Sequence, residues 1–361
     1  MINNISAKAL RARRIFTKVK KVLSPDKRKE YASFTKLRKD YYQHYWSRVA
    51  NSLDATLEDI GQDYYRIRKG DHTTYVNASN VMLDDHVSLN IAGNKVLTHK
   101  LLLEVGYQGP RYLGYTLENI EEAQAFLKKI DGPTVVKPSS GTGAGNGITT
   151  EVRTRKELVD ASIFASTCNQ NLLIEEQVKG DSYRLLYLNG KFIDAVRRDQ
   201  PVVTGDGSST ISQLIKIEND NRVNSATVTA LSPLTISDEL HTHLAMQDLT
   251  LTSVLAKGKT VTLKLVCNEN SSNENHIVKD QVHSSIVNLG ADLIKVLDLK
   301  LVGVDLITPD ITVPLEQCGG VINELNTTPG LHHHELVFEK DQIANVGVQI
   351  IDYIFQKKAG T

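Results

Sequence analysis

The segment TVVKPSSGTGAGNGITTEVR, residues 134–153, is the stretch from which the fold class is inferred. Its β-branched start, 134–136, predicts a buried strand that ends near Lys137, and 148–153 predicts a return strand. Between them lie four glycines in nine residues. Glycine-rich backbone can turn several N–H groups toward one anion, and a lysine at the strand end adds a point charge for phosphate oxygens. The glycines are Gly141, Gly143, Gly145 and Gly147.

Two common nucleotide-binding loops do not fit this segment. No Gly-Lys-Ser/Thr follows, as a phosphate-binding loop of the Walker type requires, and a strand rather than a helix comes next, which excludes a dinucleotide fingerprint. A surface hairpin with a solvated lysine is the simpler alternative for these residues alone.

A second constellation lies near the C-terminus. Asp305 interrupts the apolar run Leu301–Ile307, and Glu324 and Asn326 lie two apart in the next predicted strand, so both side chains leave the same face. If the two strands pair, three oxygen ligands converge, which suits Mg²⁺. The polar outer face of an ordinary hairpin explains the pattern equally well, although an acid within a buried strand needs a partner.

The rest of the chain predicts a mixed α/β fold with hairpins. Helices are expected near 6–23, 31–51, 97–105, 116–130, 286–297 and 343–354. Two strands joined at 69–71 are expected within 55–76, with further strands at 172–174, 183–188, 301–308 and 319–328.

Composition narrows the class of protein. The chain has 361 residues, 40% apolar and 23% charged, with 42 Lys+Arg against 42 Asp+Glu, which is ordinary for a globular protein of two or three units. No apolar run is long enough for a membrane helix and no secretory signal is evident, so no membrane span is expected. Three widely spaced cysteines fit a reducing compartment, and we expect a cytoplasmic protein.

The neutral total hides a basic arm. Residues 1–40 carry thirteen Lys/Arg against three Asp/Glu, a net charge of +10, which leaves −10 for the other 321 residues. Such an arm could touch nucleic acid, anionic lipid or an acidic partner, and a solvated basic helix is the simpler interpretation. A run of three histidines, 332–334, is interpreted as a loop, because three consecutive histidines cannot all ligate one metal ion.

These motifs, taken together, resemble the ATP-grasp superfamily, and within it the ATP-grasp portion of cyanophycin synthetases. The resemblance runs from about Tyr64 to His334 through VVKP and the glycine loop, LLIEEQVKGDSYRLL, GDGSSTISQLI, VDLI and NELNTTPG. It implies the fold of glutathione synthetase and D-alanine–D-alanine ligase. The implied division is a basic arm with a small α/β domain at 1–90, a central subdomain at 91–172 and a C-terminal subdomain at 173–361.

The resemblance also implies roles for single residues. Lys95 and Lys137, with Gly143, Gly145 and Gly147 of a lid loop, match groups that hold ATP phosphates. Arg184 and Arg198 match arginines near the phosphates or the activated substrate. Four hinge residues match the adenine site, the ribose position falls on Ser182, and three residues match ligands of Mg²⁺, with Mn²⁺ as an alternative. The hinge is Glu175, Glu176, Gln177 and Val178, and the metal ligands are Asp305, Glu324 and Asn326.

The implied activity is ATP-dependent joining of an amino acid or peptide carboxylate to an amine through an acyl phosphate. A ligase that modifies a protein or peptide terminus and a small-molecule kinase are the alternatives. Nucleic acid is not expected as a substrate, and a homo-oligomer is a possible assembly. The sequence departs from the pattern of cyanophycin synthetases at several positions. Ser182 occupies the position of an acidic residue, and Lys264 occupies the position of an arginine. The glycine loop is one residue longer, and residues 268–276 lack a Ser-Thr-Gly-Gly pattern. Because the chain ends at Thr361 without a Mur-ligase-like half, we do not expect it to make cyanophycin.

Overall fold

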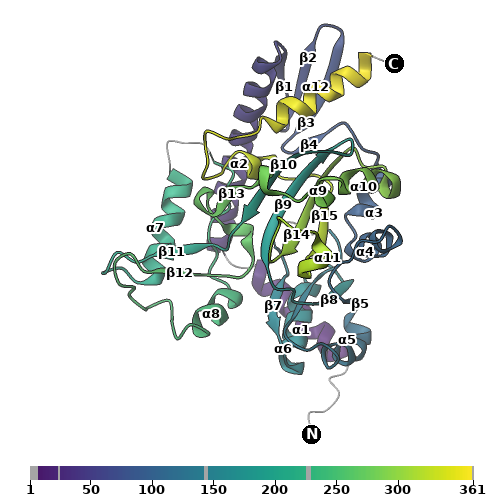
Figure 1. The fold of residues 1–361 in the computed structure, drawn as a ribbon. Helices are drawn as coiled ribbons and strands as arrows, with labels where there is room; N and C mark the ends of the chain where they lie inside the picture. The colour runs from purple at the N-terminus through teal and green to yellow at the C-terminus, as the bar shows by residue number, and fades with distance from the viewer. Residues whose placement is uncertain (1–6, 23–24, 142–144, 225–228, 360–361) are drawn as a thin grey trace.

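Five antiparallel strands form the central sheet, in the order β13-β10-β9-β14-β15 (Figure 1). The structure is a computed structural model and describes residues 7–22, 25–141, 145–224 and 229–359. Side chains alternate along a strand, so Leu185 and Tyr187 enter one apolar core while Leu186 and Leu188 enter another on the opposite face. The strands are β9 (Asp181–Leu188), β10 (Lys191–Arg198), β13 (Asn275–Ile277), β14 (Leu301–Thr308) and β15 (Val321–Asn326).

Helices cover the first of these two faces. Leu289 and Leu293 of α10 pack there beside Ala92 and Leu102, which come from two short helices that precede the second sheet. The covering helices are α3 (His86–Ala92), α4 (Lys95–Glu104), α9 (Ser284–Val287) and α10 (Leu289–Leu297), with α11 (Leu315–Cys318) in the β14–β15 connection.

A second, four-stranded sheet lies below the first in Figure 1, in the order β5-β8-β6-β7. Its core joins Val136 and Ile174 of the sheet to Ile120 and Leu158 of two helices. The elements are β5 (Tyr112–Tyr115), α5 (Ile120–Leu127), β6 (Thr134–Pro138), β7 (Thr149–Val152), α6 (Arg155–Ser166) and β8 (Leu172–Glu176). The two strands flanking the glycine loop are therefore confirmed as β6 and β7, which pair antiparallel.

The second helix and the last helix share one core. Trp46 of α2 is fully buried, and its indole Nε1 donates a hydrogen bond of 2.8 Å to the Ala78 carbonyl. Ile350 and Ile354 of the last helix join the same core, together with Ile67 of a small antiparallel sheet. These elements are α1 (Ala7–Val22), α2 (Pro25–Ser52), β1 (Thr56–Gly61), β2 (Tyr64–Lys69), β3 (His72–Asn77), β4 (Asn80–Val81) and α12 (Val346–Ala359).

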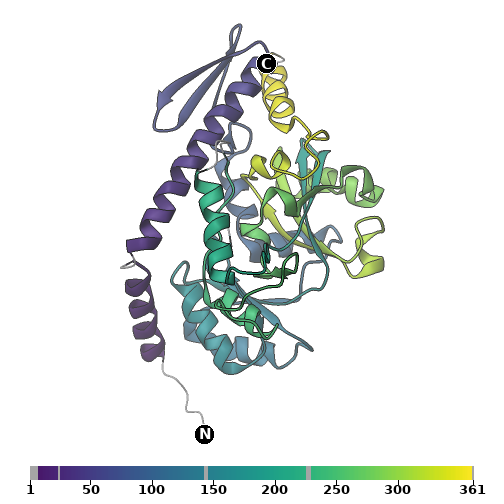
Figure 2. The same ribbon diagram turned by 90° about the vertical axis from the view of Figure 1, so that its left-hand side faces the viewer.

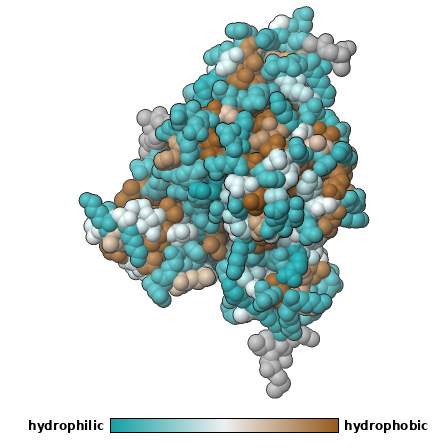
Figure 3. All heavy atoms as spheres, viewed as in Figure 1, coloured by the Kyte–Doolittle hydropathy of each residue, from teal (hydrophilic) through white to brown (hydrophobic). Residues whose placement is uncertain are grey.

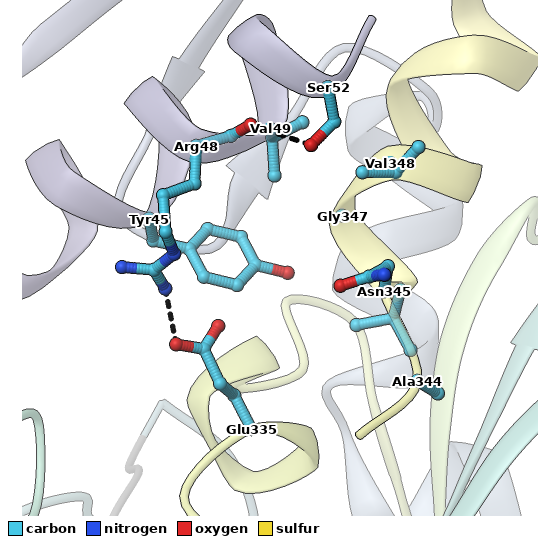
Figure 4. Close-up of a pocket in the computed structure, with 10 residues that line it drawn as sticks. Tyr45, Arg48, Val49, Ser52, Glu335, Ala344, Asn345, Gly347 and Val348 are labelled. Atoms are coloured by element: carbon cyan, nitrogen blue, oxygen red, sulfur yellow. Dashed lines mark hydrogen bonds and ion pairs between the residues drawn. The ribbon is translucent and has the colours of Figure 1, made fainter. Parts of the chain in front are cut away.

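The approach of α12 to α2 depends on a glycine. A Cβ added to Gly347 would lie 2.5 Å from the Tyr45 hydroxyl oxygen, so a side chain there would push the helices apart. Figure 4 shows Tyr45 facing Gly347 across a small hollow, with the Arg48–Glu335 ion pair at its edge. The hollow has a volume of about 40 Å³, far below the roughly 300 Å³ of the smallest ligand pockets. It is a packing feature rather than a ligand site.

An insertion between β10 and β13 forms a separate lobe. Leu214, Leu240 and Leu263 lie in its own apolar core. Exposed apolar side chains also gather on it, and Figure 3 shows brown patches over this lobe on the left. It contains β11 (Val202–Thr204), α7 (Ile211–Asn224), α8 (Asp238–Ala245) and β12 (Thr260–Thr262), and the exposed residues are Ile217, Ile236, Met246 and Val254.

The mixed α/β fold with hairpins is confirmed, with several corrections. Three strands rather than two lie within 55–76, because Gln62 and Asp63 take positive φ values of 55° and 64° and form an additional turn. The helix expected at 286–297 is divided at Asn288, and the last helix begins at Val346. The histidine run is a 3₁₀ helix, not a loop, with His332 and His334 buried. The domain boundaries stay a prediction.

None of the helices formed by the described residues is both long and apolar enough to cross a membrane.

The shared core gives the first testable prediction. Replacing Trp46 by alanine removes a fully buried indole, and the free energy of unfolding should fall by about 3–5 kcal/mol. Guanidinium unfolding followed by circular dichroism measures the change. Ile60→Ala, at a side chain 41% exposed, is the control and should change stability by less than about 0.5 kcal/mol. If Trp46→Ala unfolded at the same guanidinium concentration as the wild type, Trp46 would not stabilise this core as we expect.

Candidate active site

Strand pairing brings the three predicted metal ligands together. In the β14–β15 register Asp305 lies opposite Glu324, and Gly303 lies opposite Asn326. Residues two apart on a strand share a face, so the two carboxylates and the amide project from the same side of the sheet. The pairing on which the sequence argument depended is therefore present.

Asp305 finds its partner on the other neighbouring strand. It lies opposite Arg184 in the β14–β9 register, and the guanidinium donates two hydrogen bonds of 2.6 Å each, from Nε to Oδ1 and from Nη2 to Oδ2. Both side chains are buried. A bidentate pair is among the strongest charge-assisted contacts, so the acid within this apolar strand is compensated by Arg184.

Lys95 approaches Glu324 from α4, one of the helices that cover the central sheet. The Asn94 side chain caps α4 by accepting hydrogen bonds from the N–H groups of Val96 and Leu97. Lys95 is the first residue of this helix, and its ammonium lies 2.9 Å from Glu324 Oε2. Its backbone N–H donates to the Ser139 carbonyl at 3.0 Å, which ties the helix to the start of the glycine loop.

Lys137 forms the corresponding contact within the second sheet. Val135 lies opposite Glu175 in the β6–β8 register, so Lys137 is diagonal to Glu175 on the same face. The ammonium lies 2.6 Å from Glu175 Oε1 and also donates to Asn323 Oδ1 at 3.4 Å. Lys137 and Glu175 are each only 4% exposed, so this is a buried ion pair.

Arg198 differs from the other three cations. It is buried at the end of β10, where Nη2 donates to the Cys267 carbonyl at 3.1 Å and Nε has no hydrogen-bond partner among the described residues. Burial and the nearby Arg184 lower the pKa of Arg198. A buried guanidinium without a carboxylate contact is costly, and an anionic ligand would offset that cost.

The electrostatics of the cluster favour binding of anions and a cation together. Burial by itself raises the pKa of Glu324, but Lys95, Lys137 and Arg184 lower it to about 2, so this carboxylate is ionised at neutral pH. Burial raises the pKa of Glu175 against the opposing effect of Lys137. Four cationic side chains therefore surround three acidic ones, an excess of positive charge at the meeting point of the two sheets.

A divalent metal fits the oxygen atoms of this cluster. Asp305, Glu324 and Asn326 offer carboxylate and amide oxygens, the ligands that Mg²⁺ prefers. Asn326 Nδ2 is buried without a hydrogen-bond partner among the described residues, and as a donor it is free for an acceptor such as a phosphate oxygen. Within the described part of the chain, no three His, Cys, Asp or Glu side chains gather closely enough to hold a metal by themselves. The set would be completed by the amide and by ligand oxygens.

Comparison with known proteins identifies relatives of the chain. No protein-family model matches the chain. The chain is 30% identical over 290 residues to the cyanophycin synthetase of Crocosphaera subtropica, covering 79% of this chain and 33% of that protein. It is 27% identical over 311 residues to the glutathione biosynthesis bifunctional protein GshAB of Listeria innocua. This match covers 85% of this chain and 40% of that protein.

A solved structure agrees with these sequence matches. The bifunctional glutathione synthetase from Pasteurella multocida superposes with a TM-score of 0.55 and 23% identity, covering 84% of this chain and 41% of that one. The chain is a member of the ATP-grasp superfamily. It spans about a third to two fifths of the length of the curated relatives it matches.

The residues expected to form the adenine and ribose sites lie at the ends of β8 and β9. Glu176, at the end of β8, pairs with Arg111. The Gln177 side chain accepts a hydrogen bond of 2.8 Å from the Glu151 N–H. Val178 lies in the link to β9, where Ser182 is opposite Arg198. Their assignment to adenine and ribose in this ATP-grasp chain stays a prediction.

The glycine loop leaves β6 beside the cluster. Gly145 and Gly147 have positive φ values of 71° and 81°, and Gly143 lies outside the described residues. A Cβ on Gly145 would lie 2.9 Å from Asn268 Cγ, so glycine allows the loop to approach a segment that follows the insertion.

Three neighbours of the cluster were not expected from the sequence. Asn323 and Cys267 offer hydrogen-bond acceptors to Lys137 and Arg198. His99 of α4 is buried, and burial with Lys137 and Lys95 lowers its pKa to about 4, so it is neutral near pH 7. Asn323 adjoins Glu324 in the sequence, which could have drawn attention to it, whereas the other two residues have no local signal.

The Lys137–Glu175 pair gives the second prediction. Glu175→Gln leaves a buried ammonium without its carboxylate, and the free energy of unfolding should fall by about 3–5 kcal/mol. The double variant K137M/E175L removes both charges and should be close to wild type or more stable. Denaturant unfolding of the three proteins measures both effects. Equal losses in the single and double variants would show that the pair is not electrostatically coupled.

Proposed function

We propose that this chain is an ATP-dependent carboxylate–amine ligase that releases ADP and phosphate. The substrates would be an amino acid or peptide carboxylate and an amine. ATP would lie between the two sheets, with its phosphates toward Lys95 and Lys137 and its adenine toward residues 175–178. The proteins named above act on amino acids or peptides, as their names indicate, and this supports the choice of substrate class.

The observation that carries the proposal is the buried Arg198. Its guanidinium lies on the central sheet near Arg184, without a carboxylate to neutralise it among the described residues. Phosphoryl transfer requires charge neutralisation and alignment more than covalent help from the protein. The Arg198 guanidinium lies near β14 and β15, the strands that carry the proposed metal ligands. Its positive charge would stabilise a phosphoryl group during transfer, or the carboxylate that receives it.

The proposed reaction begins with activation of the carboxylate, which is otherwise a poor electrophile. A carboxylate oxygen forms a bond to the γ-phosphorus, the bond from this phosphorus to the bridging oxygen breaks, and ADP leaves. The amine then attacks the acyl carbon, the amide forms, phosphate leaves with the C–O bonding electrons, and the amine proton passes to water. Because water would hydrolyse the acyl phosphate, closure of the loop 139–147 would protect it.

Asp305, Glu324 and Asn326 would hold Mg²⁺, or Mn²⁺ in its place. The ion would neutralise charge on the nucleotide phosphates. Lys95 holds the Glu324 carboxylate at 2.9 Å and Arg184 orients Asp305, so both acids are positioned by cations of this chain. Selectivity for one ion, a cytoplasmic location and a homo-oligomeric assembly stay predictions.

Product analysis tests the proposed activity. Purified protein with ATP, Mg²⁺ and pools of amino acids or short peptides should release ADP and phosphate only when both a carboxylate and an amine acceptor are present. Mass spectrometry of the mixture should show one new amide. Release of AMP and pyrophosphate would refute the acyl-phosphate route, and a stable phosphorylated product without free phosphate would identify a kinase.

A matched pair of variants tests the metal assignment. Glu324→Ala removes a proposed metal ligand and should lower turnover by at least about a thousandfold. Glu121→Ala removes an exposed carboxylate from α5 and should leave turnover unchanged. Circular dichroism confirms that both variants are folded. Near-normal turnover of Glu324→Ala would remove Glu324 from the set of metal ligands.

A further inference from the structure

The inner side of α1 is fixed to the second unit. Leu10 is 1% exposed and joins the apolar core beneath α6. Arg13 forms an ion pair of 2.8 Å with Asp160, and Arg14 Nε donates to the Ser166 carbonyl at 2.7 Å. Arg11 pairs with Glu118 at the edge of this contact. The basic helix is therefore held in place along one side.

The outer side of α1 is apolar, and no other part of the described structure covers it. Ile15 and Phe16 follow Leu10 by five and six positions, which at 3.6 residues per turn puts them on the opposite side of the helix. They are 64% and 71% exposed, and the neighbouring Ala12 is exposed as well. Figure 2 shows α1 at the margin of the molecule, with its far side turned to solvent. Two large adjacent apolar side chains in this position need a partner.

Positive charge surrounds this apolar face. The helix contains seven Lys/Arg and no acidic residue between positions 7 and 22. Lys18 lies three residues after Ile15, and Lys8 lies seven residues before it, about two turns away on the same side of the helix. Both lysines are exposed, and Arg11, which pairs with Glu118, is 62% exposed. A helix with exposed Ile and Phe flanked by cations has the composition of segments that lie in the plane of a membrane interface.

We propose that α1 docks this protein on an anionic membrane surface. The apolar side chains would enter the boundary between head groups and acyl chains, while the cations contact lipid phosphates and carboxylates. A second copy of the chain is a poorer partner, because pairing two such faces would bring like charges together. Nucleic acid would engage the cations but leave Ile15 and Phe16 without a role. Because the inner side of α1 stays packed on α6, docking requires no unfolding of the core.

Vesicle sedimentation tests the proposal independently of any enzymatic activity. The full chain is mixed with vesicles of phosphatidylcholine alone or of phosphatidylcholine with phosphatidylserine. We expect strong preference for the anionic vesicles, weakened by salt. I15Q/F16Q keeps the net charge and should lower the affinity by about tenfold or more. K8Q/K18Q should lower it by about fivefold for each charge removed.

The control variant M246Q/V254Q changes two apolar side chains of similar exposure on the insertion and should bind vesicles as the wild type does. Circular dichroism should show all variants folded, since the substituted side chains are exposed. Equal binding by wild type and I15Q/F16Q, or no binding to anionic vesicles at low salt, would overturn the proposal. Absence of vesicle binding together with a dimer that I15Q/F16Q abolishes, or with DNA binding that it retains, would assign α1 to those partners instead.

Discussion

The candidate site depends on the register of one strand. β14 is paired on both sides, and this places Asp305 between Arg184 of β9 and Glu324 of β15. A shift by one residue would turn Asp305 to the opposite face, among apolar side chains packed on α10. The alternation of Val302, Val304 and Leu306 on that face opposes such a shift, because all three are buried there. The packing of the core and the chemistry of the site are thus set by the same register.

The charges of the site come from two separately packed units. Lys137 and Glu175 belong to the second sheet, whereas Asp305, Glu324 and Arg198 belong to the central sheet, on which the helix of Lys95 also packs. The hydrogen bond of 3.4 Å from Lys137 Nζ to Asn323 Oδ1 crosses from the second sheet to the central sheet. A ligand that binds at this junction would contact both units at once, and its affinity would respond to any change in their spacing.

The N-terminal helices also connect these two units. Leu10 of α1 packs beneath α6 beside the second sheet, whereas Trp46 of α2 is buried with α12 near the central sheet. The basic arm is therefore part of the fold, and acidic residues such as Asp160 and Glu118 receive its inner arginines. Its outer side, with Ile15 and Phe16, is not covered by any of the described residues.

The sequence by itself determined the class of fold, the strands flanking the glycine loop and the residue types of the site. These follow from local patterns: apolar periodicity, glycine turns and polar residues within apolar strands. The third strand within 55–76 was missed although Gly61, with a φ of 94°, directly precedes Gln62 and Asp63 and is a local turn signal. Only the tertiary structure decided that Arg184 neutralises Asp305, that Glu175 pairs with Lys137 and that Arg198 has no acidic partner among the described residues. The partners Arg184 and Asp305 are 121 positions apart, and local sequence patterns do not specify which distant strands pair or in which register.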